Sequence, residues 1–347
     1  MEDEVTGKAH GILFFNTLAF TVCFSAWMLN GTLVSYLVDN HIFEWSSVQI
    51  GWLLGLPVLT GSIFRLPAGL LTDRYGGRYV YSLLMLISAI PMFLLSFADS
   101  YFVFLLCSFG FGLTGASFAV GVAYTSVWYP AKWQGTALGI FGLGNLGAAL
   151  TTLISPSALQ FLTDSGKNLD QWRLLPTIYA VILLLMVVIF YLFTENKKPQ
   201  RTEKKFIQLL EPLRNLRVWR FGFYYFLVFG CFVAFSQWLV PYYLNVYDMP
   251  FVHAGIIASL FSFPAGIVRA LGGWLSDKFG PRKVLVSVFI ASTVLGLLLV
   301  FPKMELYSPG KGIISKNNGV VTSISDKSIS VDDKEYPLTS LKSNADL

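Results

Sequence analysis

The stretch GSIFRLPAGLLTDRYGGRYV, residues 61–80, places an arginine inside a long apolar segment. Arg65 precedes Asp73, the next charged residue, by eight positions. In a helix this spacing corresponds to roughly 12 Å. An arginine does not lose its proton, so at this depth in a membrane it must reach water or hold a partner. Arg65 is therefore a candidate functional residue.

The same pattern occurs a second time, in AGIVRALGGWLSDKFGPRKV at residues 265–284. Matches at a single offset indicate a duplicated unit. If the two copies form bundles related by an axis along the membrane normal, their arginines face one another. An offset of 204 residues aligns Arg65 with Arg269, Gly69 with Gly273, Asp73 with Asp277, Gly76 with Gly280 and Arg78 with Arg282.

The composition is typical of a membrane protein. Of 347 residues, 54% are hydrophobic and 13% are charged, whereas soluble domains carry about 25% charged residues. Runs of about 20 apolar residues can cross the hydrocarbon core of a bilayer. We therefore predict an all-α polytopic membrane protein of helical bundles, with a small C-terminal β-rich segment. Nine apolar runs cover residues 11–38, 48–70, 78–98, 101–128, 133–158, 174–194, 219–243, 252–275 and 283–301.

Polar segments divide the chain into four predicted parts. Residues 1–194 form a six-helix bundle, and residues 195–218 form a basic, amphipathic cytoplasmic linker. Residues 219–301 supply three helices of a second bundle. In residues 302–347, short β-branched runs beside Asn318-Gly319 predict a hairpin-like unit.

The distribution of basic residues predicts the orientation in the membrane. If the N-terminus is cytoplasmic, the inner segments hold fifteen Lys and Arg residues and the outer loops hold two, Lys167 and Arg173. This asymmetry follows the positive-inside rule and explains the basic charge without a nucleic-acid partner. The acidic start, MEDEVTGKAH, does not resemble a signal peptide. We expect a multi-pass plasma-membrane protein in the lipid bilayer, with residues 302–347 on the outer side.

The sequence shows no pattern typical of a metal site, a cofactor site or an enzyme. Cys23, Cys107 and Cys231 all lie within predicted spans, where they are best interpreted as packing residues. No nucleophile and base stand at a recognisable spacing. We therefore expect no cofactor, no metal and no enzymatic activity.

The paired arginines favour an anion site. An intramembrane salt bridge is the structural alternative, but it needs a carboxylate, and acids such as Asp39 and Asp99 lie in loops or at span ends. Exposing an arginine to lipid would cost at least about 2.5–3.5 kcal/mol. The planar guanidinium can donate two parallel hydrogen bonds to a small planar oxyanion. Arg65 and Arg269 therefore predict such a site.

A glycine-rich segment, GTALGIFGLGNLGAAL, occupies residues 135–150. Glycines such as Gly135 and Gly139 are typical of close packing between membrane helices. The amide of Asn145 could bind an anion or serve the same packing, and the residues themselves leave both interpretations open.

The turn between the second and third spans is a candidate gate. Its acid can cap a following helix and pair with basic residues nearby, forming a contact in one conformation and losing it in another. The residues assigned to this gating loop are Gly69, Asp73, Arg74, Gly76 and Arg78, with Asp277 in the second copy.

Two motifs resemble those of a known family. The turn around Asp73 is similar to the signature loop of the major facilitator superfamily. The segment GFGLTGASFAVGVAYTSVWYPAKWQGTALGIFGLGNLGAA, residues 110–149, resembles the nitrate signature of the nitrate/nitrite porter family within it. The family has twelve spans, so the last three are missing from the nine predicted here. The resemblance therefore implies either that the chain is a fragment that ends inside an inserted outer segment, or that the remaining helices come from another chain.

The resemblance also implies roles for particular residues. By position, Arg65, Arg269 and Asn145 match substrate-binding residues of the family. Phe118 is similar to an aromatic residue that packs on the substrate. Tyr225 and Phe229, in YYFLVFGCF, resemble aromatic residues lining the same pocket. Without the resemblance, these aromatic residues would be interpreted as core or lipid-facing.

The predicted function is secondary active transport of nitrate and nitrite by alternating access, as an antiporter. A nitrate/proton symporter is the alternative within this class, although His10, His41 and His253 lie at span edges and no carboxylate lies within a span. A membrane sensor that binds the anion and signals through the β-rich segment is an alternative from another class.

Overall fold

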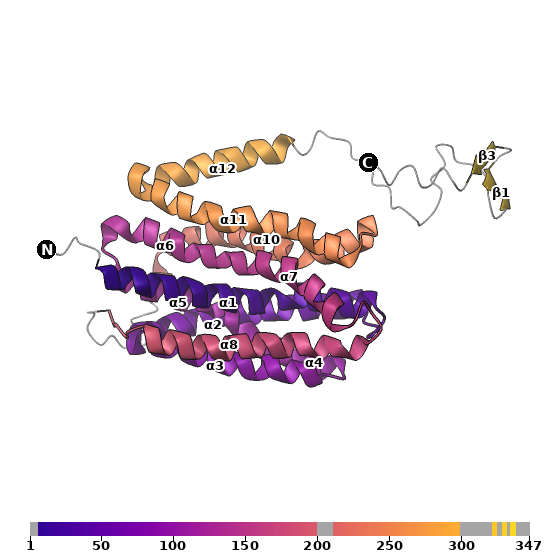
Figure 1. The fold of residues 1–347 in the computed structure, drawn as a ribbon. Coiled ribbons are helices and arrows are strands. Elements are labelled where there is room, and N and C mark those ends of the chain that lie inside the picture. The colour runs from indigo at the N-terminus through magenta and orange to yellow at the C-terminus, as the bar shows by residue number, and fades with distance from the viewer. Residues whose placement is uncertain (1–5, 200–210, 299–320, 325–327, 332–333, 338–347) are drawn as a thin grey trace.

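The computed structural model describes residues 6–199 and 211–298, and the backbone of three short segments at 321–324, 328–331 and 334–337. Among these residues, nine helical segments are long and apolar enough to cross a membrane. The nine predicted spans are therefore confirmed. The helices run side by side along a common direction (Figure 1). We call the end where α1 begins, at Gly7, the proximal end, and the end near Asp39 the distal end.

Six spans come from the first part of the chain. Three are α1 (Gly7–Asp39), α2 (Ser47–Tyr75) and α3 (Gly77–Leu94), the last extended by the 3-10 helix η1 (Leu95–Phe97). The sixth consists of η5 (Leu169–Arg173) and α8 (Leu174–Phe193). The remaining three spans are α10 (Leu216–Tyr247), preceded by η6 (Glu211–Arg214), then α11 (Phe251–Phe279) and α12 (Pro281–Leu298).

The fourth and fifth spans are interrupted at their glycine-rich stretches. Glycine is a poor helix former, so these stretches tighten locally into 3-10 turns. The fourth span consists of α4 (Tyr101–Phe111), η2 (Gly112–Ala116) and α5 (Ser117–Trp128). The fifth consists of η3 (Ala131–Trp133), α6 (Gln134–Gly142), η4 (Leu143–Asn145) and α7 (Leu146–Leu162).

Helix α11 packs closely along α6 and α7. A Cβ at Gly139 would lie 2.7 Å from the carbonyl oxygen of Arg269, and a Cβ at Gly273 would strike the carbonyl of Gly135. The two helices thus approach backbone to backbone, which confirms the prediction that the glycines of the fifth span serve close packing.

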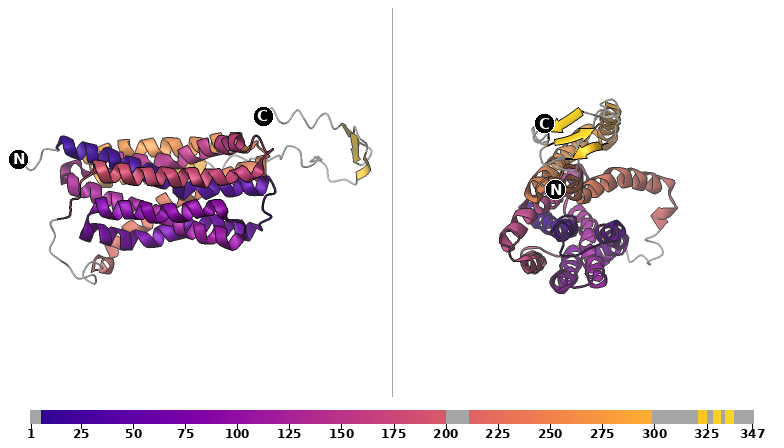
Figure 2. Two further views of the ribbon diagram at one scale, coloured as in Figure 1. Left: turned by 60° about the horizontal axis from the view of Figure 1, so that its bottom comes forward. Right: turned by 90° about the vertical axis from the view of Figure 1, so that its right-hand side faces the viewer.

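Helix α10 contacts α1 and α11, but only its later turns are buried. The first buried residue of the helix is Phe229. Both views in Figure 2 show the start of α10 standing away from the other helices. The first two turns of α10, residues 216–223, are therefore exposed.

The second and eighth spans extend beyond their predicted ends. The hydropathy pattern predicts ends at residues 70 and 275, whereas α2 continues to Tyr75 and α11 to Phe279. Each helix stops only at a glycine of positive φ, Gly76 at 91° and Gly280 at 90°. Other residues rarely adopt this conformation. Asp73 and Asp277 therefore lie in the last helical turns rather than in loops.

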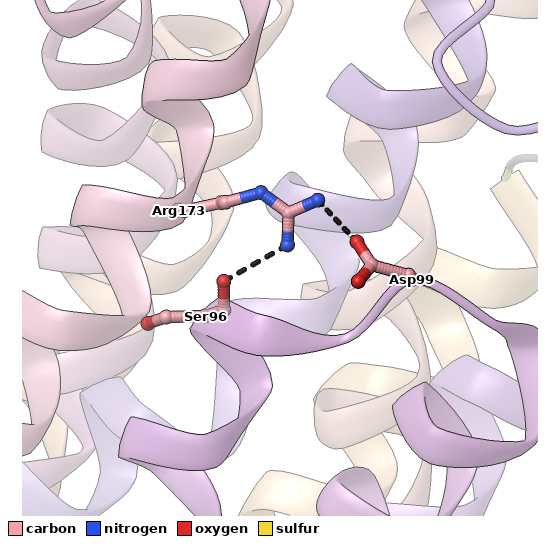
Figure 3. Close-up of polar contacts among 3 residues, drawn as sticks. All are labelled: Ser96, Asp99 and Arg173. Carbon is pink, nitrogen blue, oxygen red and sulfur yellow. Dashed lines mark hydrogen bonds and ion pairs between the residues drawn. The ribbon is translucent and has the colours of Figure 1, made fainter.

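At the distal end, an arginine ties two spans together. Arg173 donates to the carbonyl oxygen of Ser96 at 2.9 Å and pairs with Asp99 at 2.5 Å. Figure 3 shows the guanidinium reaching between the two acceptors. The turn after α3 is thereby held against the start of α8.

Three short strands follow near the C-terminal end. They are β1 (Val321–Ile324), β2 (Ser328–Val331) and β3 (Lys334–Pro337), joined in an antiparallel sheet of order β1-β2-β3. Residues 200–210 of the predicted linker lie outside the described residues, as do Asn318-Gly319 and the rest of 302–347 beyond the strands.

Candidate functional site

Arg65 projects from α2 toward the break in the fourth span. Its Nε donates to the carbonyl oxygen of Gly115 in η2 at 3.3 Å, and its Nη1 donates to the hydroxyl of Tyr225 on α10 at 3.4 Å. Its Nη2 is buried and has no hydrogen-bond partner within the described part of the chain. Both bonds are long for N–H donors, so the group is held in place and still has hydrogen bonds to donate.

Arg269 occupies the matching place on α11. Its side chain lies along Gly142, where a Cβ would come within 3.2 Å of the Cβ and Cδ of the arginine. Its Nε is buried and lacks a partner among the residues that the structure describes. A side chain at 142 would therefore crowd this arginine, which lies between α6 and α10.

The two arginines meet at one aromatic ring. The guanidinium carbon of Arg65 lies 4.9 Å from the ring centroid of Phe229, and that of Arg269 lies 5.5 Å from it. Phe229 in turn stacks on Tyr225 at 4.9 Å and on Phe118 at 5.8 Å between centroids. The structure thus brings five of the six predicted substrate-binding residues together.

No acidic side chain neutralises these arginines within the described residues. The ion pairs found there join Lys8 to Glu195, Lys167 to Asp164 and Arg173 to Asp99. The salt-bridge alternative is therefore not realised in this part of the chain. Over the same residues, no three His, Cys, Asp or Glu side chains gather closely enough to hold a metal ion.

Asn145 lies near this group without joining it directly. It is fully buried in η4, and its Nδ2 donates to the carbonyl oxygen of Gly142 at 2.7 Å. Its Oδ1 has no partner among the described residues. Asn145 therefore bonds within its own turn, and Gly142, which accepts this bond, packs against Arg269.

Three groups at the site are not predicted from the sequence. The Trp27 ring lies 5.6 Å from the guanidinium carbon of Arg65, and the Phe232 ring lies 5.3 Å from that of Arg269. The third is the carbonyl of Gly115. Phe232 follows Phe229 by one helical turn, and this spacing is the one signal that could have indicated it.

In the second copy of the gating loop, Asp277 at the end of α11 is hydrogen-bonded to the start of α6. The Asp277 carboxylate accepts hydrogen bonds from the backbone N–H groups of Gly135 at 3.0 Å and Thr136 at 2.6 Å, and from the Thr136 hydroxyl at 2.6 Å. The sequence predicts a cap on the following helix, whereas Asp277 caps α6, which comes earlier in the chain. A carboxylate at a helix N-terminus is favourable because it meets unpaired N–H groups and the positive end of the dipole.

The first copy of the loop contacts the end of α8 and the residues that follow it. Asn196 donates to the carbonyl oxygen of Tyr75 at 2.9 Å, and any side chain at Gly76 would collide with Asn196. Arg78 donates to the carbonyl oxygen of Tyr191 and covers its ring at 4.2 Å. The remaining members, Gly69, Asp73 and Arg74, lie on α2, and Arg74 covers the Tyr75 ring at 5.5 Å.

A family model places the chain in a known superfamily. The model described as Major Facilitator Superfamily matches residues 15–310. Among solved structures, an inward-facing, unoccupied bacterial homologue of the human lysosomal transporter Spinster has a TM-score of 0.60 at 23% identity, covering 80% of this chain and 64% of its own. This second likeness concerns the fold alone.

Curated relatives define the branch within that superfamily. A probable nitrate/nitrite antiporter, NarK1 of Thermus thermophilus, is 41% identical over 84% of this chain and 67% of its own length. The nitrite extrusion protein of Bacillus subtilis is 29% identical over 90% of this chain and 77% of its own. NarK2 of Mycobacterium tuberculosis, a probable nitrate/nitrite transporter, is 31% identical over 85% and 74%. This multi-pass membrane protein therefore belongs to the Major Facilitator Superfamily and, within it, to the family of nitrate/nitrite porters.

Proposed function

We propose that the chain exchanges nitrate and nitrite across the plasma membrane by alternating access, with the anion bound between Arg65 and Arg269. One observation carries the proposal. Two guanidinium groups contact the same Phe229 ring, each keeps a buried N–H without a partner, and no carboxylate pairs with either among the described residues.

The chemistry of the surroundings fits a small planar monoanion. Each guanidinium is planar and can present two parallel N–H groups to such an ion. Phe118 and Phe229 offer ring faces and no competing hydrogen bonds. The Tyr225 hydroxyl accepts from Arg65, so its own proton is available to donate to an anion. In the proposal Asn145 supports the site through Gly142.

The same arrangement accounts for exchange rather than free diffusion. Two like charges in a medium of low dielectric repel one another strongly, so an empty site resists closing around both arginines. A bound anion removes this repulsion. The protein therefore reorients readily only when loaded, and nitrate moving one way is coupled to nitrite moving the other way.

The proposal treats residues 1–194 and 219–301 as the two moving bundles, joined by the linker at 195–218. The contact of Asp277 with Gly135 and Thr136 fastens α11 to α6 at the proximal end. Opening that end requires these three hydrogen bonds to break. We assign the loop around Asp73 the corresponding role in the first bundle.

The substrates and the orientation are also part of the proposal. The names of the Thermus and Mycobacterium relatives mention nitrate and nitrite, which supports the choice of anions. The chain spans 67% of the length of the Thermus relative, and in the proposal transport requires the further helices that complete the second bundle. From the distribution of basic residues we propose that the N-terminus lies in the cytoplasm and residues 302–347 outside.

Counterflow in proteoliposomes tests the function. Exchange predicts that labelled nitrate enters nitrite-loaded vesicles faster than empty ones, with no dependence on a pH gradient. Uptake into empty vesicles that a pH gradient drives would instead establish nitrate/proton symport. Nitrate binding without any flux would identify a sensor and contradict transport. Vesicles without protein and the Lys167→Gln protein serve as controls, because Lys167 is an exposed residue of the distal end.

A further inference from the structure

The start of α10 carries a cluster of exposed cations that form no ion pair with the part of the chain that the structure describes. Arg214 lies in η6, and Arg217 and Arg220 lie in the first turns of α10, all exposed. We call these three residues the α10 basic face. Among the described residues, none of them forms an ion pair, and Glu211, the nearest acid in the sequence, does not pair with them. The first turn of α10 contains no acidic residue.

Three other cations at the proximal end contact the protein. Lys8 pairs with Glu195, Arg78 bonds the carbonyl of Tyr191, and Lys197 covers the Trp128 ring at 4.7 Å. The α10 basic face differs because the start of the helix stands clear of the bundle (Figure 2). The described residues therefore leave these charges open to water or to a partner in the membrane.

An apolar stripe runs beside the basic face on the same helix. Leu216, Trp219, Phe223 and Phe226 recur at helical spacing and are 74%, 63%, 62% and 71% exposed. Such a stripe matches acyl chains, and a tryptophan at its end is typical of the membrane–water interface. Cations next to this stripe therefore lie where lipid headgroups begin.

The position of the last arginine agrees with this depth. After Arg220, 27 residues follow without a charge, up to Asp248. A helix of 27 residues is about 40 Å long, which spans the roughly 30 Å of hydrocarbon and reaches into the headgroup region, and tilting takes up part of the excess. Arg220 then lies at the level of the lipid phosphates, with Arg217 about one turn further out.

We propose that the α10 basic face binds the phosphate of an anionic phospholipid, whose acyl chains cover Phe223 and Phe226 while Trp219 lies at the level of the headgroup. The occupant is a lipid of the surrounding bilayer. Arginine suits this role because its fork binds phosphate oxygens in pairs. The surface lies outside the proposed nitrate site, so the inference does not depend on the transport proposal.

Spin-labelled lipids test the inference on the full chain in phosphatidylcholine vesicles that contain a minor fraction of phosphatidylglycerol. The wild type is expected to enrich labelled phosphatidylglycerol over labelled phosphatidylcholine at its surface. Arg217→Gln and Arg220→Gln should each lower that preference at this site by roughly fivefold. Arg220→Lys should retain most of it, since the charge remains. Inorganic phosphate should not displace the lipid.

Two controls separate lipid binding from structural damage. Lys167→Gln removes an exposed cation at the distal end and should leave the lipid preference unchanged. Thermal unfolding of each variant shows whether the fold is retained. The inference is overturned if the wild type shows no preference for phosphatidylglycerol, as expected if the arginines bind an acidic protein segment. It is equally overturned if the Arg217→Gln/Arg220→Gln double variant keeps the full preference.

Discussion

Phe229 is the residue at which the two halves of the candidate site meet. It contacts Arg65 from α2, Arg269 from α11 and Tyr225 from its own helix. A cation over an aromatic ring gains about 0.5–2 kcal/mol, with the larger values in dry surroundings. The ring therefore stabilises both charges while leaving their N–H groups available to an anion.

Replacing the Phe229 ring by a smaller apolar side chain should weaken nitrate binding while still filling most of the space that the ring occupies. Phe229→Leu keeps an apolar side chain but removes both cation–π contacts, so we expect nitrate affinity to fall roughly 5- to 30-fold. Equilibrium binding of labelled nitrate to purified protein measures this. Phe235→Leu is the matched control on the same helix, because Phe235 contacts no arginine among the described residues. Equal losses in both variants would show that the effect is one of general packing.

Single residues also show how far sequence reasoning reaches at this site. Arg65 and Arg269 are detectable because a charge inside an apolar run is costly and the two recur at one offset. Trp27 and Phe232 are not, because an apolar residue gives the same signal whether it faces lipid, core or site. Hydropathy could not identify Phe118, Tyr225 and Phe229 either, for the same reason. These three residues were predicted only from the family resemblance.

At the scale of elements, the contact between α6 and α11 determines how closely the two arginines can approach. The backbones meet at Gly135, Gly139 and Gly273, where no side chain intervenes. This contact also presents the N-terminus of α6 to Asp277. The same pair of helices thus carries both the substrate-binding arginine of α11 and the proposed gate.

A single methyl group at this contact should be enough to disturb it. The Cβ of Gly273→Ala would strike the Gly135 carbonyl, so we expect a loss of about 1–3 kcal/mol in stability. Gly272→Ala, one residue earlier, meets nothing within 4 Å and should leave stability nearly unchanged. Thermal unfolding of the two purified variants measures the difference. Equal unfolding temperatures would contradict the backbone-to-backbone contact.

The gate can be weakened without changing its shape. Asp277→Asn removes the negative charge that the α6 N-terminus favours, at a cost of about 0.5–2 kcal/mol to the closed state. A single cysteine in place of Ala270, which lies against Gly139, reports on opening. In a background without native cysteines, a water-soluble maleimide should label it several times faster when Asn replaces Asp277. Unchanged labelling would exclude a gating role for this carboxylate.

Elements differ in how well their limits can be predicted. All nine spans follow from hydropathy, because a bilayer requires long apolar helices. The ends of the helices do not follow from hydropathy. Helices α2 and α11 continue through charged turns and end only at Gly76 and Gly280, because a charged residue does not end a helix whereas a residue of positive φ does. The breaks at η2 and η4 lie within apolar runs and leave no trace in hydropathy.

For the whole molecule, the duplicated arrangement brings the two arginines together in the way that the 204-residue offset predicts. Arg65 and Arg269 lie on different helices, α2 and α11, and reach the same ring from α10. The repeat alone could not show that Asp277 would cap α6, because that contact depends on which helices become neighbours. No carboxylate among the described residues pairs with these arginines. In the proposed mechanism, the bound anion supplies the negative charge that compensates them.

Nitrate binding to arginine variants tests this central claim most directly. Arg65→Lys and Arg269→Lys each keep a positive charge but lose the bidentate fork, whereas Arg282→Lys makes the same change at an exposed position away from the site. Labelled nitrate is titrated into each purified protein after its fold has been verified by thermal unfolding. The account predicts a loss of affinity of roughly 10- to 100-fold in the first two variants and none in the third. Wild-type affinity in either Arg65→Lys or Arg269→Lys would contradict it.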